Sequence, residues 1–294
     1  MNIIAQLQGG LGNQLFQYAT ARSLSIVKKA PLLLDCTWYQ QTYDDVTPRE
    51  LLIKELKTAG AVISLEQTTQ KPKRIRRLLQ NIWPLSPYIF YEGSTYHFDR
   101  RVFMAPLFAQ QDLYLMGYWQ SYKYFEAIKS TLAAELTPQK TLSSHYQTYL
   151  EKIQGVQSAM VHIRRGDYVT LNSANKVHGT LSIDYYRNGM EKLLERDRET
   201  HFFIFSDDLA WAKQNLPTTK QITFIESIDS TNAVIQELEL MKYCKSYLIA
   251  NSSLSWWGAW LSNNKNAFVI CPKNWTQDLK MNWDDLIPAN WISL

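Results

Sequence analysis

Four clusters of polar residues could bind an anionic ligand, and each follows an apolar stretch that is typical of a buried strand. Their members supply positive charge, carboxylates, hydroxyl groups and free backbone N–H groups. The clusters are Gly9 to Gln14, His162 to Tyr168, Ser206 to Asp208, and Asn251 to Ser255. Because parallel strands end at a common edge of their sheet, we expect these clusters to converge on a ligand site.

The cluster that begins at His162 carries the most specific signal. Arg164 and Arg165 are adjacent at the end of an apolar strand, and their forked guanidinium groups suit a diphosphate. The structural alternative is an ion pair with a carboxylate such as Asp167. For two arginines in this position we favour anion binding.

The glycine-rich turn Gly9 to Gln14 lies between an apolar strand and a helix. Such turns let the backbone approach phosphate groups at a helix N-terminus. The spacing G-G-x-G-N matches neither of the two common nucleotide fingerprints, so the turn alone does not identify a ligand.

The other two clusters and one further carboxylate each allow a structural and a functional interpretation. Asp207 and Asp208 could cap a helix or anchor a ribose or a reacting sugar. Asn251, Ser252 and Ser253 could cap a helix or hold a phosphate with free N–H groups and the helix dipole. Glu237, on a predicted helix, could be solvated or could accept the N1–H and N2–H groups of a guanine.

The predicted elements form two α/β halves with parallel sheets that face a ligand cleft. We place the boundary near residue 150, which gives domains 1–150 and 151–294. Residues 36–106 are rich in aromatic residues and proline and have an irregular pattern. The expected strands are 2–7, 31–34, 111–117, 157–163, 201–206, 221–225, 246–250 and 266–271, and the expected helices are 12–28, two before 155, 182–195, 231–243 and one from 253.

The composition is that of a soluble globular protein, with 46% hydrophobic and 20% charged residues. A net charge of +4 is too small to favour nucleic acid as the main partner. The cysteines Cys36, Cys244 and Cys271 are too widely spaced for a zinc motif and fit a reducing cytoplasm. We identify no signal peptide and no transmembrane stretch.

A basic run, Lys71 to Arg77, accounts for much of the positive charge. It could be a solvated helix face, or it could contact an acidic membrane surface or an anionic substrate. No D-x-D sequence occurs, so we expect no metal bridge to a sugar-nucleotide diphosphate.

Together the stretches GGLGNQLFQYA, HIRRGDYV, FSDD and NSSLSWWGAW resemble the bacterial α-1,2-fucosyltransferases, glycosyltransferase family 11. More distantly, the pattern is similar to α-1,6- and protein O-fucosyltransferases. The resemblance implies a GT-B-like fold and metal-free, inverting transfer of fucose from GDP-fucose to O2 of a terminal β-galactoside.

The resemblance also implies roles for single residues. The diphosphate would lie on Arg164 and Arg165, with Gly10 and Gly12 letting the backbone close against the donor. His162 would help to read guanine together with Glu237, where relatives usually carry aspartate. Asn13 would orient the donor or the acceptor hydroxyl, and Asp167 is our nominee for a general base or for the residue that fixes the arginines.

We therefore expect a cytoplasmic enzyme that needs no cofactor and acts on a galactose-ended oligosaccharide or a lipid-linked glycan, with residues 71–77 as a candidate contact with the inner membrane face. We expect acceptor selectivity to lie in residues 36–106. Two alternatives stay open: a glycosyltransferase with another sugar nucleotide or fucose linkage, and a non-catalytic nucleotide- or carbohydrate-binding protein.

Overall fold

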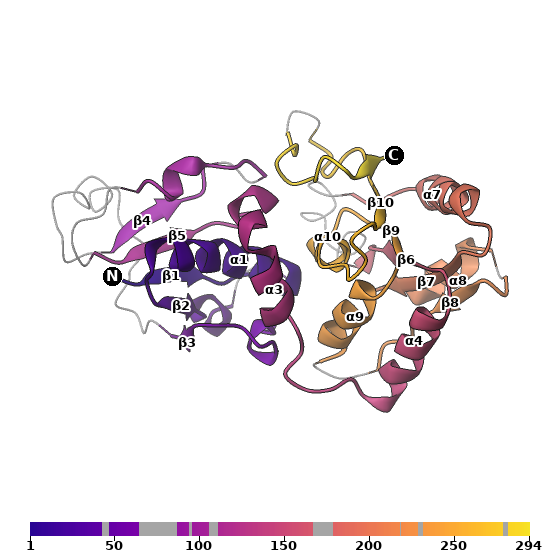
Figure 1. Cartoon of the computed structure of the whole chain (residues 1–294), viewed down its shortest axis with the longest axis horizontal. Helices are drawn as coiled ribbons and strands as arrows, with labels where there is room; N and C mark the ends of the chain where they lie inside the picture. The colour runs from indigo at the N-terminus through magenta and orange to yellow at the C-terminus, as the bar shows by residue number, and fades with distance from the viewer. Residues whose placement is uncertain are drawn as a thin grey trace. The chain divides into compact units, whose positions relative to one another are not determined.

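The computed structural model divides into two units, each built around its own sheet (Figure 1). Unit 1 comprises Met1–Thr137 and Asn282–Pro288, and unit 2 comprises Pro138–Met281 and Ala289–Leu294. The two α/β domains predicted from the sequence are present, and the chain first passes between them after Thr137 instead of near residue 150. The described residues are 1–42, 47–64, 87–93, 96–105, 111–166, 179–217, 219–228, 232–278 and 282–294.

In the described part of unit 1, five parallel strands form a sheet in the order β3-β2-β1-β5-β4. The edge strands β3 and β4 lie in the stretch that the sequence predicted to be irregular. Both are short and at least partly exposed, so they lack the apolar run that marks a buried strand. The bounds are β1 Ile3–Gln6, β2 Leu32–Asp35, β3 Ala61–Ile63, β4 Tyr88–Tyr91 and β5 Leu113–Met116.

Helix α1 (Leu11–Lys28) follows β1 and packs against it, and one of its buried side chains joins several loops. Gln14 donates from Nε2 to the carbonyl oxygens of Gly9 (3.0 Å) and Glu50 (2.8 Å). Its Oε1 accepts the N–H groups of Leu52 and Ile53, both at 3.0 Å. The side-chain amide of Gln14 thus holds the glycine-rich turn against the segment Glu50–Ile53.

Short helical segments complete the described part of unit 1. Helix α3 is tied to α1 because Glu135 accepts the guanidinium of Arg22 at 2.8 Å and the hydroxyl of Tyr18 at 2.5 Å. The segments are η1 Thr37–Gln40, η2 Ile53–Glu55, η3 Arg100–Val102, η4 Tyr122–Tyr124, η5 Glu126–Ile128 and α3 Lys129–Glu135.

In the described part of unit 2, six parallel strands form a sheet in the order β11-β10-β9-β6-β7-β8. The central strand β6 is buried throughout and lies between β9 and β7, so three predicted polar clusters follow adjacent strands. The bounds are β6 Ser158–Ile163, β7 His201–Ser206, β8 Ile222–Phe224, β9 Ser246–Leu248, β10 Phe268–Cys271 and β11 Ile292–Ser293.

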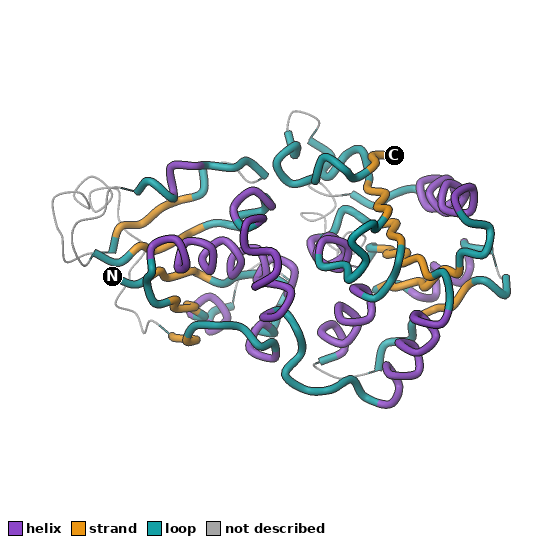
Figure 2. Tube along the Cα trace, viewed as in Figure 1, coloured by secondary structure: helices purple, strands orange, loops and turns teal. Residues whose placement is uncertain are grey.

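The helices of unit 2 alternate with its strands (Figure 2). Helices α7 and α8 pack on one face of the sheet in a core that includes Val161, Tyr186 and Ala212. Because successive strand residues point to opposite faces, His162 belongs to the other face. The bounds are α4 Ser144–Gly155, α7 Ile183–Arg196, α8 Leu209–Asn215, α9 Ala233–Lys242 and α10 Ser253–Trp260.

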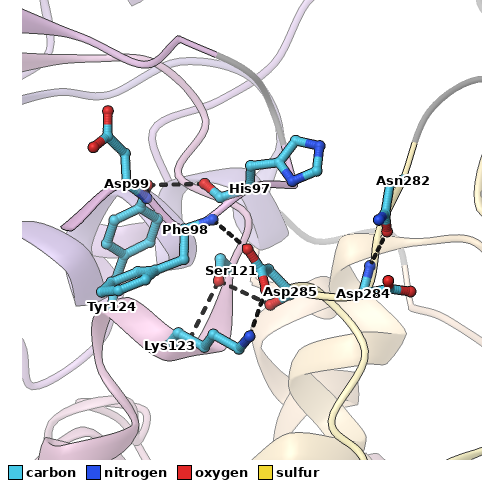
Figure 3. A network of polar contacts seen from close by, with 9 residues as sticks. All are labelled: His97, Phe98, Asp99, Ser121, Lys123, Tyr124, Asn282, Asp284 and Asp285. Carbon is cyan, nitrogen blue, oxygen red and sulfur yellow. Dashed lines mark hydrogen bonds and ion pairs between the residues drawn. The ribbon is translucent and has the colours of Figure 1, made fainter. Parts of the chain in front are cut away.

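Near its C-terminus the chain returns to unit 1 through residues 282–288, and Asp285 anchors this return (Figure 3). The Asp285 carboxylate accepts the N–H of Phe98 at 2.7 Å and pairs with Nζ of Lys123 at 2.5 Å. Its backbone carbonyl accepts the hydroxyl of the buried Ser121 at 2.8 Å. From Ala289 the chain belongs to unit 2 again, where β11 pairs with β10.

Candidate functional site

At the carboxyl ends of β6 and β7, two of the predicted clusters bind each other. Nη1 of Arg164 lies 2.8 Å from Oδ2 of Asp207. The same carboxylate accepts the backbone N–H groups of Arg165 at 2.8 Å and Gly166 at 3.1 Å. Three donors therefore converge on one carboxylate, which is the arrangement that holds an anion in a binding site. The side chains of Arg164 and Asp207 are 23% and 24% exposed, so solvent reaches the pair.

Arg165 is held by a second aspartate and by an aromatic ring. Its Nε lies 3.2 Å from Oδ2 of Asp208, and its guanidinium lies 4.2 Å from the centroid of the Trp211 ring. Oδ1 of Asp208 accepts the N–H of Trp211 at 3.0 Å, which makes Asp208 the N-cap of α8. Both structural interpretations of these residues, the helix cap and the ion pair, are present.

His162 is buried in β6 beside this group. Burial, and to a smaller extent the charge of Arg164, lower its pKa to about 4 against the opposing effect of Asp207, so the ring is neutral at pH 7. Its Nδ1 has no hydrogen-bond partner among the described residues. Because a buried polar atom normally has a partner, this nitrogen is a candidate ligand contact.

The third cluster of unit 2 follows β9, the other neighbour of β6. Nδ2 of the buried Asn251 lies 3.3 Å from the carbonyl oxygen of Gly179 and 3.4 Å from that of Trp275, so Asn251 joins two loops. Ser252 occupies the N-cap position of α10, but its side chain makes no capping hydrogen bond. Ser252 and Ser253 are partly exposed, which leaves the start of α10 accessible to an anion.

Glu237 on α9 is not a solvated helical residue. Its Oε1 accepts the hydroxyl groups of Tyr146, at 3.3 Å, and of Ser227, which follows β8. Burial raises the pKa of this carboxyl group, although the two hydroxyl groups oppose the shift. The carboxylate is thus a partly desolvated acceptor at a fixed position.

In unit 1 the glycine-rich turn lies at the carboxyl end of β1. Gly9 has φ 77°, a conformation that other residues rarely adopt, and a Cβ there would lie 2.8 Å from Nδ2 of Asn13, so the turn favours glycine. Gly10 is the N-cap of α1 with an ordinary φ of −75°, and Gly12 is buried in the first turn of the helix. Oδ1 of Asn13 accepts Nε2 of Gln120 at 2.8 Å.

Gln120 belongs to a turn, Gly117–Gln120, that the sequence analysis missed. The turn follows β5, the strand beside β1, and the Glu92 carboxylate accepts the N–H groups of Tyr118 at 2.6 Å and Trp119 at 2.9 Å. The available signal was a glycine at the end of a predicted strand, followed by two aromatic residues and a glutamine. Because aromatic residues are common in cores, that signal was not specific.

Two predicted features, Asp167 and the basic run 71–77, lie outside the described residues. Among the described residues, no group of three or more His, Cys, Asp or Glu side chains could hold a metal ion. No described helix has the length and apolar character needed to span a membrane. Cys36, Cys244 and Cys271 are free thiols, Cys36 half-buried and the other two buried.

The two parallel-sheet units have the architecture of the GT-B fold. The solved fucosyltransferase NodZ from Bradyrhizobium superimposes with a TM-score of 0.52, at 12% identity, over 88% of this chain and 93% of that chain. The model of Glycosyl transferase family 11 matches residues 2–294, so the chain belongs to that family. The family predicted from the four motifs is confirmed.

Relatives are similar along nearly the whole chain. An alpha-1,2-colitosyltransferase from Escherichia coli is 30% identical over 99% of this chain and 98% of its own length. The O-antigen biosynthesis glycosyltransferase WbnK, also from Escherichia coli, is 26% identical over 98% and 99%. A galactoside 2-alpha-L-fucosyltransferase from Caenorhabditis elegans is 26% identical over 97% of this chain and 77% of its own length.

Proposed function

We propose that this glycosyltransferase moves fucose from GDP-fucose, with inversion, to the 2-hydroxyl of a terminal β-galactoside. The observation that carries the proposal is the pair Arg164 and Arg165 at the carboxyl end of β6, in a chain of family 11. The galactoside 2-alpha-L-fucosyltransferase among its relatives supports fucose as the sugar and O2 as the acceptor position.

In this mechanism the arginine pair receives the donor diphosphate. Arg164 exchanges its ion pair with Asp207 for the diphosphate, which presents similar oxygens and more charge. Ser252 and Ser253, at the start of α10, add hydroxyl and N–H donors. These groups stabilise the charge that develops on the leaving GDP, so no metal ion is required.

The guanine base would be read by Glu237 and His162. The Glu237 carboxylate accepts N1–H and N2–H of guanine, a pair of donors that adenine and uracil do not offer. The neutral His162 ring presents its unpartnered Nδ1. A GDP preference over UDP and ADP follows from these two side chains.

The acceptor hydroxyl attacks the anomeric carbon from the face opposite GDP, in one displacement. The C–O bond to GDP breaks as the new bond forms, and the hydroxyl proton passes to a base, for which Asp167 is our candidate. Asn13 orients the donor or the acceptor hydroxyl. The relative WbnK is an O-antigen biosynthesis glycosyltransferase, which favours an O-antigen precursor as the acceptor. We place this acceptor on a lipid at the cytoplasmic membrane face, with residues 71–77 as the candidate membrane contact.

A second donor deserves a direct comparison because one relative is a colitosyltransferase. Colitose is fucose that lacks its 3-hydroxyl group, so the two donors share their diphosphate, base and anomeric chemistry. The difference lies in whether the site offers a hydrogen-bond partner to that one hydroxyl group. GDP-colitose is therefore the competing donor within the same reaction class.

The test is to incubate the protein with lactose and either GDP-fucose or GDP-colitose, in excess EDTA, and to identify the product by mass and linkage analysis. An α-1,2-fucosylated product supports the proposal. A product that forms with GDP-colitose and not with GDP-fucose would show that colitose is the transferred sugar. Product that forms only when Mn²⁺ is added would contradict metal-free transfer.

Thermal shifts with GDP, UDP and ADP test which base the protein prefers, because a ligand that binds the native state raises the stability of that state. GDP stabilisation with no transfer to any galactose-ended acceptor and no donor hydrolysis indicates a binding protein.

A further inference from the structure

The turn Gly117–Gln120 in unit 1 is held in a strained shape by contacts on every side. Trp119 has φ 59°, a conformation that is unusual for a bulky residue, and Gly117 has φ 154°. A Cβ on Gly117 would lie 2.4 Å from Cβ of Glu92, so no other residue fits. The Glu92 carboxylate binds the two N–H groups in the middle of the turn, and Gln17 on α1 donates to the Gly117 carbonyl at 3.2 Å.

In this backbone conformation the side chains of the turn differ in how far they are exposed to solvent. Trp119 is 1% exposed and packs against the rings of Phe90 and Tyr124, at centroid distances of 6.1 and 5.5 Å. Gln120 is 7% exposed, whereas Tyr118, taken as a whole residue, is 39% exposed. The backbone is therefore fixed in a conformation that presents one aromatic side chain to solvent. Strain of this kind persists where surrounding contacts impose it, most often at functional sites.

Tyr118 lies two positions before a side chain that binds the predicted reacting residue of unit 1. Gln120, two positions after Tyr118, donates to Oδ1 of Asn13 at 2.8 Å. Tyr39 donates its hydroxyl to the Gly9 carbonyl at 2.8 Å, and it lies close enough to Tyr118 for the two side chains to interact electrostatically. Tyr118 thus borders the glycine-rich turn at the carboxyl ends of β1 and β5.

We infer that Tyr118 is the platform on which the terminal galactose ring of the acceptor rests, with Asn13 beside the hydroxyl group that reacts. The inference rests on the function proposed above, because it concerns the acceptor of that reaction. One face of a galactose ring carries mainly C–H groups, which pack on an aromatic ring, while its hydroxyl groups remain free for polar partners. A platform fixed by Glu92 and Trp119 has little side-chain and backbone freedom to lose when the sugar binds.

This position differs from the one expected from the sequence, which assigned acceptor selectivity to residues 36–106. The turn contributes a rigid surface for the sugar that all galactose-ended acceptors share. Residues 36–106 would then act on the rest of the glycan. The two roles are separable, because a disaccharide acceptor such as lactose tests the first alone.

The experiment compares the wild-type enzyme with Tyr118→Ala and Tyr118→Phe. The control is Tyr88→Ala, which removes a partly exposed tyrosine from the amino end of β4 in the same sheet. We expect Tyr118→Ala to raise the KM for lactose about tenfold, the effect of losing one stacked ring, with the Kd for GDP unchanged. Tyr118→Phe keeps the ring and should stay within about twofold of the wild-type KM, as should the control.

A second measurement keeps the test independent of transfer. Saturation-transfer NMR with lactose should show contact at the galactose C–H protons in the wild-type protein and in Tyr118→Phe, and the contact should disappear in Tyr118→Ala. If no fucosylated product forms, the proposed function fails, and the NMR comparison still decides whether Tyr118 binds the sugar. An unchanged KM and NMR contact in Tyr118→Ala, or a Kd for GDP that rises with the KM, would overturn the inference. If Tyr118→Ala melts at a lower temperature, Tyr118→Gln replaces it in both measurements.

Discussion

Replacing Asp207 by asparagine should tighten the binding of GDP, although Asp207 lies in the middle of the candidate donor site. Its carboxylate binds three donors, from Arg164, Arg165 and Gly166, that we assign to the donor diphosphate. Asparagine has the same shape and keeps one oxygen, which can accept one of the two backbone N–H groups that bind different oxygens of Asp207. It lacks the negative charge that holds the Arg164 guanidinium and repels an incoming diphosphate.

The expected gain follows from the distance and the exposure of the pair. Opposite unit charges about 4 Å apart attract by about 4 kcal/mol at an effective dielectric constant of about 20. Partial exposure, at 23% and 24%, lets solvent screen the pair and reduces the net effect to about 1–2 kcal/mol. Since about 1.4 kcal/mol corresponds to a factor of ten, GDP should bind Asp207→Asn about tenfold more tightly.

Isothermal titration of GDP into both proteins at fixed salt concentration measures this change. Glu226→Gln is the matched control, because Glu226 forms an ion pair with Lys213 at the same distance of 2.8 Å, in an exposed position. The control should leave the Kd for GDP unchanged. A Kd that is unchanged or larger in Asp207→Asn would refute displacement and would show that Asp207 serves the bound donor, for example at its ribose or sugar.

Four further predictions concern three side chains. Arg164→Ala should lower kcat/KM about 100-fold or more while far-UV circular dichroism stays unchanged, because a group that stabilises the leaving diphosphate is lost; near wild-type turnover would exclude that role. Glu237→Gln should weaken GDP binding about tenfold in calorimetry, since a charged acceptor is lost. Burial raises the pKa of Glu237, so its negative charge destabilises the native state, but only at pH values above the pKa of the unfolded state. Glu237→Gln should therefore raise Tm at pH 7 and leave Tm unchanged below pH 4. Equal changes in Tm at the two pH values would contradict this. Gln14→Ala should reduce the free energy of unfolding by about 2–4 kcal/mol in urea titrations, because two N–H and two carbonyl groups lose their partner; a loss below about 1 kcal/mol would show that water replaces the amide.

The sequence was most informative where strands are buried on both faces. Strand β6 and its polar end, from His162 to Arg165, are readable because a continuous apolar run stops abruptly at charged residues. The edge strands β3 and β4 were missed, since short and partly exposed strands carry no such contrast. The family motifs located residues on both units, but they did not reveal which side chains contact one another.

Long-range pairing is the part that sequence reasoning could not supply. The ion pair between Arg164 and Asp207 joins two separate strand ends, and only the parallel pairing of β6 with β7 brings them together. The same is true of Glu92, which reads as an ordinary polar residue until β4 and β5 lie side by side. Glu237 was a candidate guanine acceptor from the sequence, whereas its hydrogen bond with Tyr146 from a different helix could not be foreseen.

The return of residues 282–288 to unit 1 has a consequence for hybrid enzymes. Neither unit is a contiguous piece of chain, and Asp285 supplies partners for Phe98, Ser121 and Lys123 from near the far end of the sequence. A chimera that takes everything after residue 137 from a relative would also import a foreign anchor. To exchange the unit that we propose to bind the donor between family members, the transplanted part should be 138–281 with 289–294, and the intervening anchor should come from the recipient.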